Sequence, residues 1–176
     1  MNANTNVKMK WKRGTTLIGE PLENYLSKIL DEELAKGYGL RVSIGTDSQR
    51  SGRGHKFATV ILIATTQDLG GGIVVGRGGL IISATYHIDG LPRTKKGVNQ
   101  RMIIEVSKSI EAASEIAELM DMYGIKLEIH ADINPDPKWE SNKALQEAIG
   151  YILGMGYEFK IKPDAFATKG ADHLCQ

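Results

Sequence analysis

The segment Leu40-Arg41-Val42-Ser43-Ile44-Gly45-Thr46-Asp47 is a mostly apolar run that ends on an acid. Such a run, with its β-branched residues, is typical of a buried strand. A second run, 125–131, ends in the same way on Asp132. The carboxyl ends of neighbouring parallel strands meet at one edge of an open α/β sheet, where such proteins place their ligand sites. The sequence therefore predicts an α/β fold with an acidic site at that edge.

Hydrophobic periodicity predicts the remaining elements. Apolar residues at helical spacing predict helices over 17–38, 98–123 and 141–153. Runs rich in β-branched residues predict strands over 56–66, 80–86 and 157–161. Hairpins would join the first three strands, and helical crossovers would add the last two in parallel. We therefore expect a mixed five-stranded sheet of order 3-2-1-4-5, with strand 2 antiparallel, flanked by helices and with an extra N-terminal helix.

Length and composition indicate one globular domain. The chain has 176 residues, a formal net charge of +1 and one cysteine, Cys175. We expect a flexible tail over 1–13, which is polar and basic, and a single domain over 14–176. No apolar run is long enough to span a bilayer, and a single cysteine allows no internal disulfide, so the sequence favours a cytoplasmic protein. The small net charge neither indicates nor excludes a nucleic-acid partner.

Two further acids reach the same edge by topology. Glu105 lies early in the helix that starts there, and the segment after the last strand carries Asp164 and Asp172, either of which fits. Crowded carboxylates raise one another's pKa values unless a cation neutralises them. Carboxylate oxygens are also the ligands that Mg²⁺ prefers, and a pair of divalent ions about 4 Å apart drives phosphodiester hydrolysis.

Several motifs resemble the YkuK-type family of ribonuclease-H-like proteins. They are Gly45-Thr46-Asp47-Ser48-Gln49, Arg101-Met102-Ile103-Ile104-Glu105, Asp132-Ile133-Asn134, Ser141-Asn142-Lys143, Lys162-Pro163-Asp164-Ala165 and Ala171-Asp172. The resemblance runs from about residue 18 to the end of the chain. It implies a ribonuclease-H-like fold, and by inheritance from the superfamily it implies nuclease activity, although fold alone does not fix function.

The resemblance also assigns the site residues. Motif by motif, Asp47, Glu105, Asp132 and Asp172 take the catalytic and metal-binding places, with two Mg²⁺ or Mn²⁺ ions as cofactors. It selects Asp172 over Asp164. The segment after the last strand is short, so we expect the closing helix that often supports the fourth acid to be missing or minimal.

Polar and basic residues beside the acids are candidates for substrate binding. Ser48, Gln49 and Asn134 flank the acids, where they either orient water and sugar hydroxyls or cap backbone groups. A basic loop with Lys95 and Lys96, together with Arg101, either meets a phosphate backbone or serves solubility.

Three functions follow from these residues. The first is a metal-dependent nuclease that cleaves RNA, DNA or their hybrid by a two-metal-ion mechanism. The alternative is a non-catalytic nucleic-acid-binding module that retains the fold. A nucleotide-binding or phosphotransfer relative is the third, and it lacks support because the glycines at 70–79 are not followed by the lysine and serine or threonine of a phosphate-binding loop.

Overall fold

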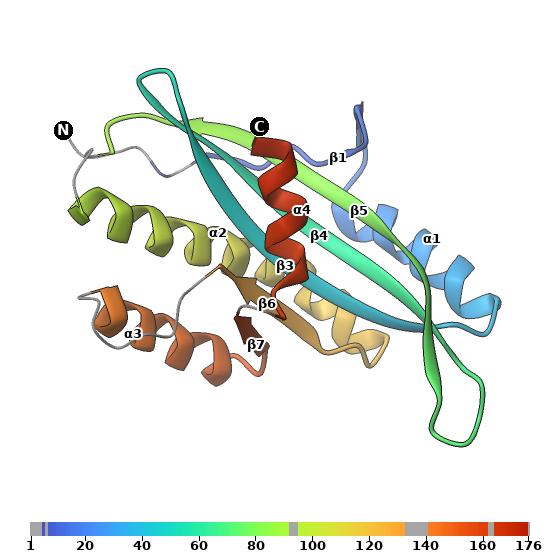
Figure 1. Cartoon of the computed structure of the whole chain (residues 1–176). Coiled ribbons are helices and arrows are strands. Elements are labelled where there is room, and N and C mark those ends of the chain that lie inside the picture. Colours follow the sequence, from blue (N-terminus) through green and yellow to red (C-terminus); the bar gives the residue numbers. More distant parts are fainter. Residues whose placement is uncertain (1–4, 6, 92–94, 133–140, 162–163, 176) are drawn as a thin grey trace.

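The computed structural model describes residue 5 and residues 7–91, 95–132, 141–161 and 164–175. The strands are β1 (Lys12–Arg13), β2 (Thr16–Leu17), β3 (Gly39–Ser51), β4 (Gly54–Asp68), β5 (Val74–Ile88), β6 (Leu127–Ala131) and β7 (Glu158–Ile161). The helices are α1 (Leu22–Ala35), α2 (Lys95–Met122), α3 (Ser141–Gly154) and α4 (Phe166–Cys175). Figure 1 shows these elements on one mixed sheet.

The sheet has the order β2-β1-β5-β4-β3-β6-β7. The predicted count of five strands is therefore wrong, because β1 pairs with the outer edge of β5 and β2 pairs with β1. The five expected strands are neighbours in the predicted order and directions. β4 pairs antiparallel with both β3 and β5, β6 pairs parallel with β3, and β7 pairs parallel with β6. The antiparallel strands run beyond their predicted ends, because cross-strand pairing continues through polar residues to the hairpin turn at Gly52.

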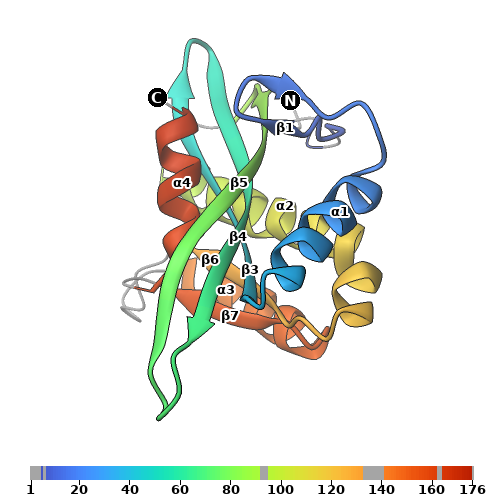
Figure 2. The ribbon, with the colours of Figure 1, turned by 90° about the vertical axis from the view of Figure 1, so that its right-hand side faces the viewer.

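Helices cover both faces of the sheet. Figure 2 shows α4 on one face and α1 and α2 on the opposite face. α1 forms because Leu22, Leu26, Ile29 and Leu30 recur on one side, and all four are buried. The main core lies between the sheet and this second helical layer, where its largest fully buried side chains include Ile44, Phe57, Ile61, Ile82, Ile116 and Met120.

The N-terminal segment is packed from Val7 onward, so the predicted flexible tail over 1–13 is wrong for its second half. Met9 and Trp11 are buried, and the Trp11 indole N–H donates to Glu115 at 3.1 Å. Lys12 pairs with Ser83 on β5. The sequence indicated a polar tail because basic residues alternate here with the apolar residues Val7, Met9 and Trp11 that pack on the core.

A closing helix is present, which corrects the expectation that it is missing or minimal. α4 spans ten residues and buries Ala167, Ala171 and Cys175. It approaches the sheet closely at Gly45, where an added Cβ would lie 2.8 Å from the Thr168 backbone nitrogen. Small residues on both surfaces thus allow a short helix to dock.

No helix in the described part of the chain is long and apolar enough to cross a membrane.

Candidate active site

Asp47 and Asp132 occupy matching positions on adjacent strands. β3 and β6 pair in parallel with Val42 opposite Leu127 and Gly45 opposite His130. Continuing this register by two residues brings Asp47 level with Asp132, just beyond the last residue of β6. Asp47 does not end its own strand as predicted, because β3 continues to Ser51. It lies instead where its parallel neighbour stops.

Alternate residues of β3 face different helices. Gly45 and Gln49 contact α4, so Asp47 between them lies on the α4 face, where its cross-strand partner Ala58 also packs. Thr46 and Ser48 bond to α2 on the opposite face. β6 ends just before this level. Side chains from both faces of the sheet therefore approach Asp47 past the end of that strand.

Glu105 approaches from α2. The Ser48 hydroxyl donates to Glu105 Oε1 at 2.5 Å. Burial raises the pKa of Glu105 to about 8, the Ser48 hydrogen bond opposes this shift, and the charges of Asp47 and Asp132 add to it. The carboxyl group of Glu105 is therefore close enough to both aspartates to be repelled by them.

Asp172 approaches from α4. The Gln49 amide donates to Asp172 Oδ1 at 2.6 Å. Burial raises the pKa of Asp47, a hydrogen bond from the Ser48 backbone opposes the shift, and the charges of Asp172 and Asp132 raise it further. Asp164, the other candidate, is exposed before α4 begins. The four acids thus come from β3, α2, α4 and the end of β6.

Two of the four carboxylates accept hydrogen bonds from neighbouring side chains of β3. Among the residues that the structure describes, no group of three or more histidine, cysteine, aspartate or glutamate side chains is arranged to hold a metal ion. Ser48 and Gln49, the candidates for substrate binding or backbone capping, each donate a hydrogen bond to an acid. An acid cluster with raised pKa values fits a hard divalent cation, because the cation would remove both the repulsion and the burial penalty.

Arg101 lies one helical turn before Glu105. Its charge lowers the pKa values of Asp47 and Glu105, yet within the described chain it forms no ion pair with either acid. The guanidinium group is thus near the acids without neutralising them by contact. The backbone of Lys95 and Lys96 lies in the first turn of α2, and Asn134 lies outside the described residues.

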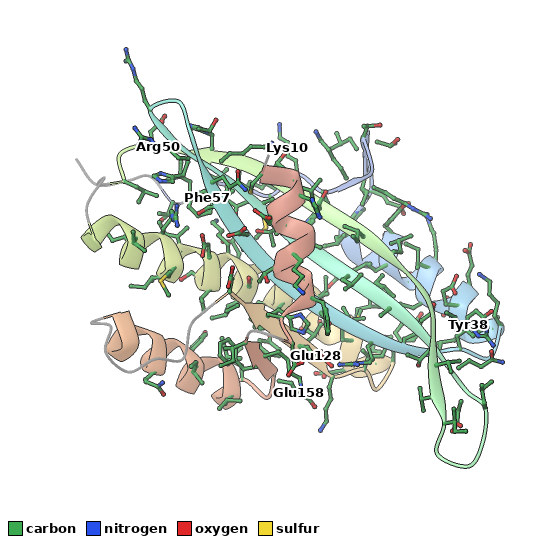
Figure 3. All side chains as sticks on the ribbon, viewed as in Figure 1. Lys10, Tyr38, Arg50, Phe57, Glu128 and Glu158 are labelled. Carbon is green, nitrogen blue, oxygen red and sulfur yellow. The ribbon has the colours of Figure 1, made fainter. Side chains whose placement is uncertain are left out.

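A buried cluster of polar residues that the sequence did not predict holds α4 in place. His130 is 2% exposed, and its Nδ1 accepts a hydrogen bond from the Ala167 backbone N–H at 3.1 Å. Its Nε2 therefore carries the proton and donates to Glu128 at 3.0 Å. Arg41 Nη2 donates to the other oxygen of Glu128 at 2.8 Å. Figure 3 shows Glu128 beside the first turn of α4.

Electrostatics fix the protonation states in this cluster. Burial lowers the pKa of His130, although Glu128 opposes the shift. Burial alone would raise the pKa of Glu128, but hydrogen bonds from Arg41 and His130 outweigh it and lower the pKa. A neutral imidazole therefore connects an ionised carboxylate to the N-terminus of α4. Glu128 and His130, two residues apart within an apolar strand, were the sequence signal for this cluster.

The chain belongs to the ribonuclease H-like family, because the family model described as Ribonuclease H-like matches residues 24–176. It is also similar to "Uncharacterized protein YkuK" of Bacillus subtilis (strain 168), with 30% identity over 140 residues that cover 72% of this chain and 73% of that protein. No solved structure matches.

Proposed function

We propose that this protein is a divalent-metal-dependent nuclease that hydrolyses phosphodiester bonds of RNA or DNA. The observation that carries the proposal is the meeting of Asp47, Glu105, Asp132 and Asp172 around the end of β6, with the pKa values of Asp47 and Glu105 raised by burial and by neighbouring acids. Keeping such groups uncompensated costs stability, and active sites are where that cost is commonly found.

Asp47 and Asp132 are the principal ligands in this proposal, and Glu105 and Asp172 complete the set. When bound, two Mg²⁺ or Mn²⁺ ions supply Lewis acidity for activating water and for stabilising the leaving oxygen. Ser48 and Gln49 orient Glu105 and Asp172. In the net reaction, a water oxygen bonds to phosphorus and one P–O ester bond breaks, which leaves a phosphomonoester and a hydroxyl group.

The test is cleavage of labelled single-stranded RNA, single-stranded DNA and RNA–DNA hybrid with Mn²⁺. We expect Asp47→Asn to lower the cleavage rate by at least about 100-fold, or about 2.7 kcal/mol of transition-state stabilisation. The matched control is Asp164→Asn, which removes an exposed acid from the segment that precedes α4 and leaves the rate unchanged. Equal cleavage by Asp47→Asn and the unmodified protein would refute the proposal.

A non-catalytic nucleic-acid-binding module is the second candidate. It is favoured by the hydrogen bonds that Glu105 and Asp172 already accept from Ser48 and Gln49, and by the lack of a ready metal-binding group in the described part of the chain. Binding of the same nucleic acids without any product, in the presence of Mn²⁺, would select this function.

A further inference from the structure

Contacts between α2 and β3 repeat at a regular interval. Ser109 bonds to Thr46 at 2.9 Å, and Glu105 bonds to Ser48 at 2.5 Å. Four residues along a helix span about 6 Å, and two residues along a strand span about 6.6 Å. Moving four residues toward the start of α2 therefore corresponds to moving two residues along β3 toward the β3–β4 turn.

The next step brings three basic side chains together. It places Arg101 over Arg50, whose cross-strand partner on β4 is His55. Figure 3 shows Arg50 at the hairpin end, on the side where α2 begins. The pKa of His55 reflects this proximity: burial lowers it, and the charges of Arg101, Arg50 and His87 lower it further.

This basic group contains two buried nitrogen atoms without partners. Within the described structure, His55 Nδ1 and Arg101 Nε are buried and form no hydrogen bond. A buried donor that is left unsatisfied costs about 1–3 kcal/mol, and more when it is charged. Asp89, an acid beside the hairpin, is paired with His87 at 3.3 Å and is mostly exposed. An anion between His55 and Arg101 would satisfy both nitrogens.

We propose that His55, Arg101 and Arg50 form a subsite for a backbone phosphate of nucleic acid, one row beyond the acids. The inference rests on the proposed function for its ligand class and adds a second point of contact to it. The non-bridging oxygens of a phosphodiester accept hydrogen bonds from His55 Nδ1–H and Arg101 Nε–H together. Arg50, which is exposed, adds a charge at the open side. The phosphate held here neighbours the one that is hydrolysed.

The experiment measures binding without cleavage. Fluorescence anisotropy of a labelled single-stranded oligonucleotide is recorded in EDTA at pH 7.5, over a range of salt concentrations. We expect His55→Leu and Arg101→Met each to weaken binding about tenfold, and His55→Gln, which keeps an N–H donor, to bind nearly as tightly as the unmodified protein. The control is Arg77→Met, because Arg77 bonds to Gln67 in the β4–β5 hairpin; its affinity stays unchanged.

Salt dependence separates the two roles. Arg101→Met removes a charge, so the slope of log affinity against log salt becomes shallower by about 0.7 for a single strand. His55→Leu removes a neutral donor, so it lowers affinity and leaves the slope unchanged. Thermal melts identify a variant that fails to fold. In that case His55→Gln and Arg50→Gln supply the comparison. We expect Arg50→Gln to reduce the slope of log affinity against log salt in the same way as Arg101→Met.

Affinities of His55→Leu and Arg101→Met equal to that of Arg77→Met would overturn the subsite. If those variants also cleave normally with Mn²⁺, the proposed hydrolysis stands while the subsite falls. Binding of inorganic phosphate measured by calorimetry, together with no binding of the oligonucleotide, would overturn the assignment to a nucleic-acid backbone.

Discussion

Two of the four acids in the site are held by neutral side-chain donors. Ser48 bonds to Glu105 and Gln49 bonds to Asp172. These neighbours were predicted from their positions beside Asp47, but the sequence left open whether they would contact substrate or protein. Side chains of successive strand residues point to opposite faces, so which helix each one meets depends on where α2 and α4 dock. The residues around Asp47 do not determine where either helix docks.

The raised pKa of Glu105 predicts how stability depends on pH without metal. The unfolded carboxyl group ionises near its ordinary value of 4.5, and the folded group ionises near 8. The folded state thus binds more protons between these values, so its free energy of unfolding falls as pH rises from about 4.5 to about 8. Because water reaches part of the side chain, we expect a loss of about 2 kcal/mol.

Urea denaturation in EDTA at pH 5, 7 and 9 measures this loss. Glu105→Gln, which cannot ionise, should reduce the decline and be more stable than the unmodified protein at pH 9. A residual slope belongs to Asp47, whose pKa is also raised. Parallel stability curves for the two proteins would show that Glu105 ionises normally in the folded state.

α4 is the element that sequence periodicity missed. Its buried residues are Ala167, Thr168, Ala171 and Cys175, which are all small, so the sequence shows no stripe of large apolar side chains over these ten residues. Its place is set by the close approach at Gly45 and by the bond from the Ala167 N–H to His130. Strands and the long helices were predictable because their apolar patterns are strong, and their ends were not, because cross-strand pairing extends them through polar residues.

Removing the His130 acceptor should loosen α4. An unsatisfied backbone N–H costs about 1–3 kcal/mol, which raises the population of undocked α4 by about 5- to 150-fold. Cys175 reports this motion, because it is the single cysteine of the chain and is buried against β3. Burial raises the pKa of its thiol to about 12, so the docked form reacts slowly with thiol reagents.

The measurement is the rate of reaction of Cys175 with a disulfide reagent, below the unfolding transition. His130→Leu should react about tenfold faster than the unmodified protein, and His130→Asn, whose side-chain oxygen is an acceptor, should restore slow reaction. The control is Tyr123→Phe, which removes a distant hydrogen bond to Asp31. Equal rates in His130→Leu and Tyr123→Phe would mean that His130 does not hold α4.

At the scale of the whole molecule, the order of the five main strands was predictable from hairpins and crossovers, and the added edge strands were not. β1 and β2 have two residues each, too few for a periodic signal. The site was predictable to the extent that topology brings strand ends and helix starts to one edge. The packing of α4 and of the N-terminal segment could not be derived, because it depends on long-range contacts such as that between Trp11 and Glu115.

The sheet and both helical layers together bring Asp47, Glu105, Asp132 and Asp172 to one place, and metal binding there is the central claim. Anomalous diffraction from a crystal soaked in Mn²⁺ tests it most directly. We predict two manganese peaks among these four carboxylates, with Glu105 and Asp172 turned from Ser48 and Gln49 toward the ions. A map without manganese at this site, with both hydrogen bonds intact in the soaked crystal, would contradict it.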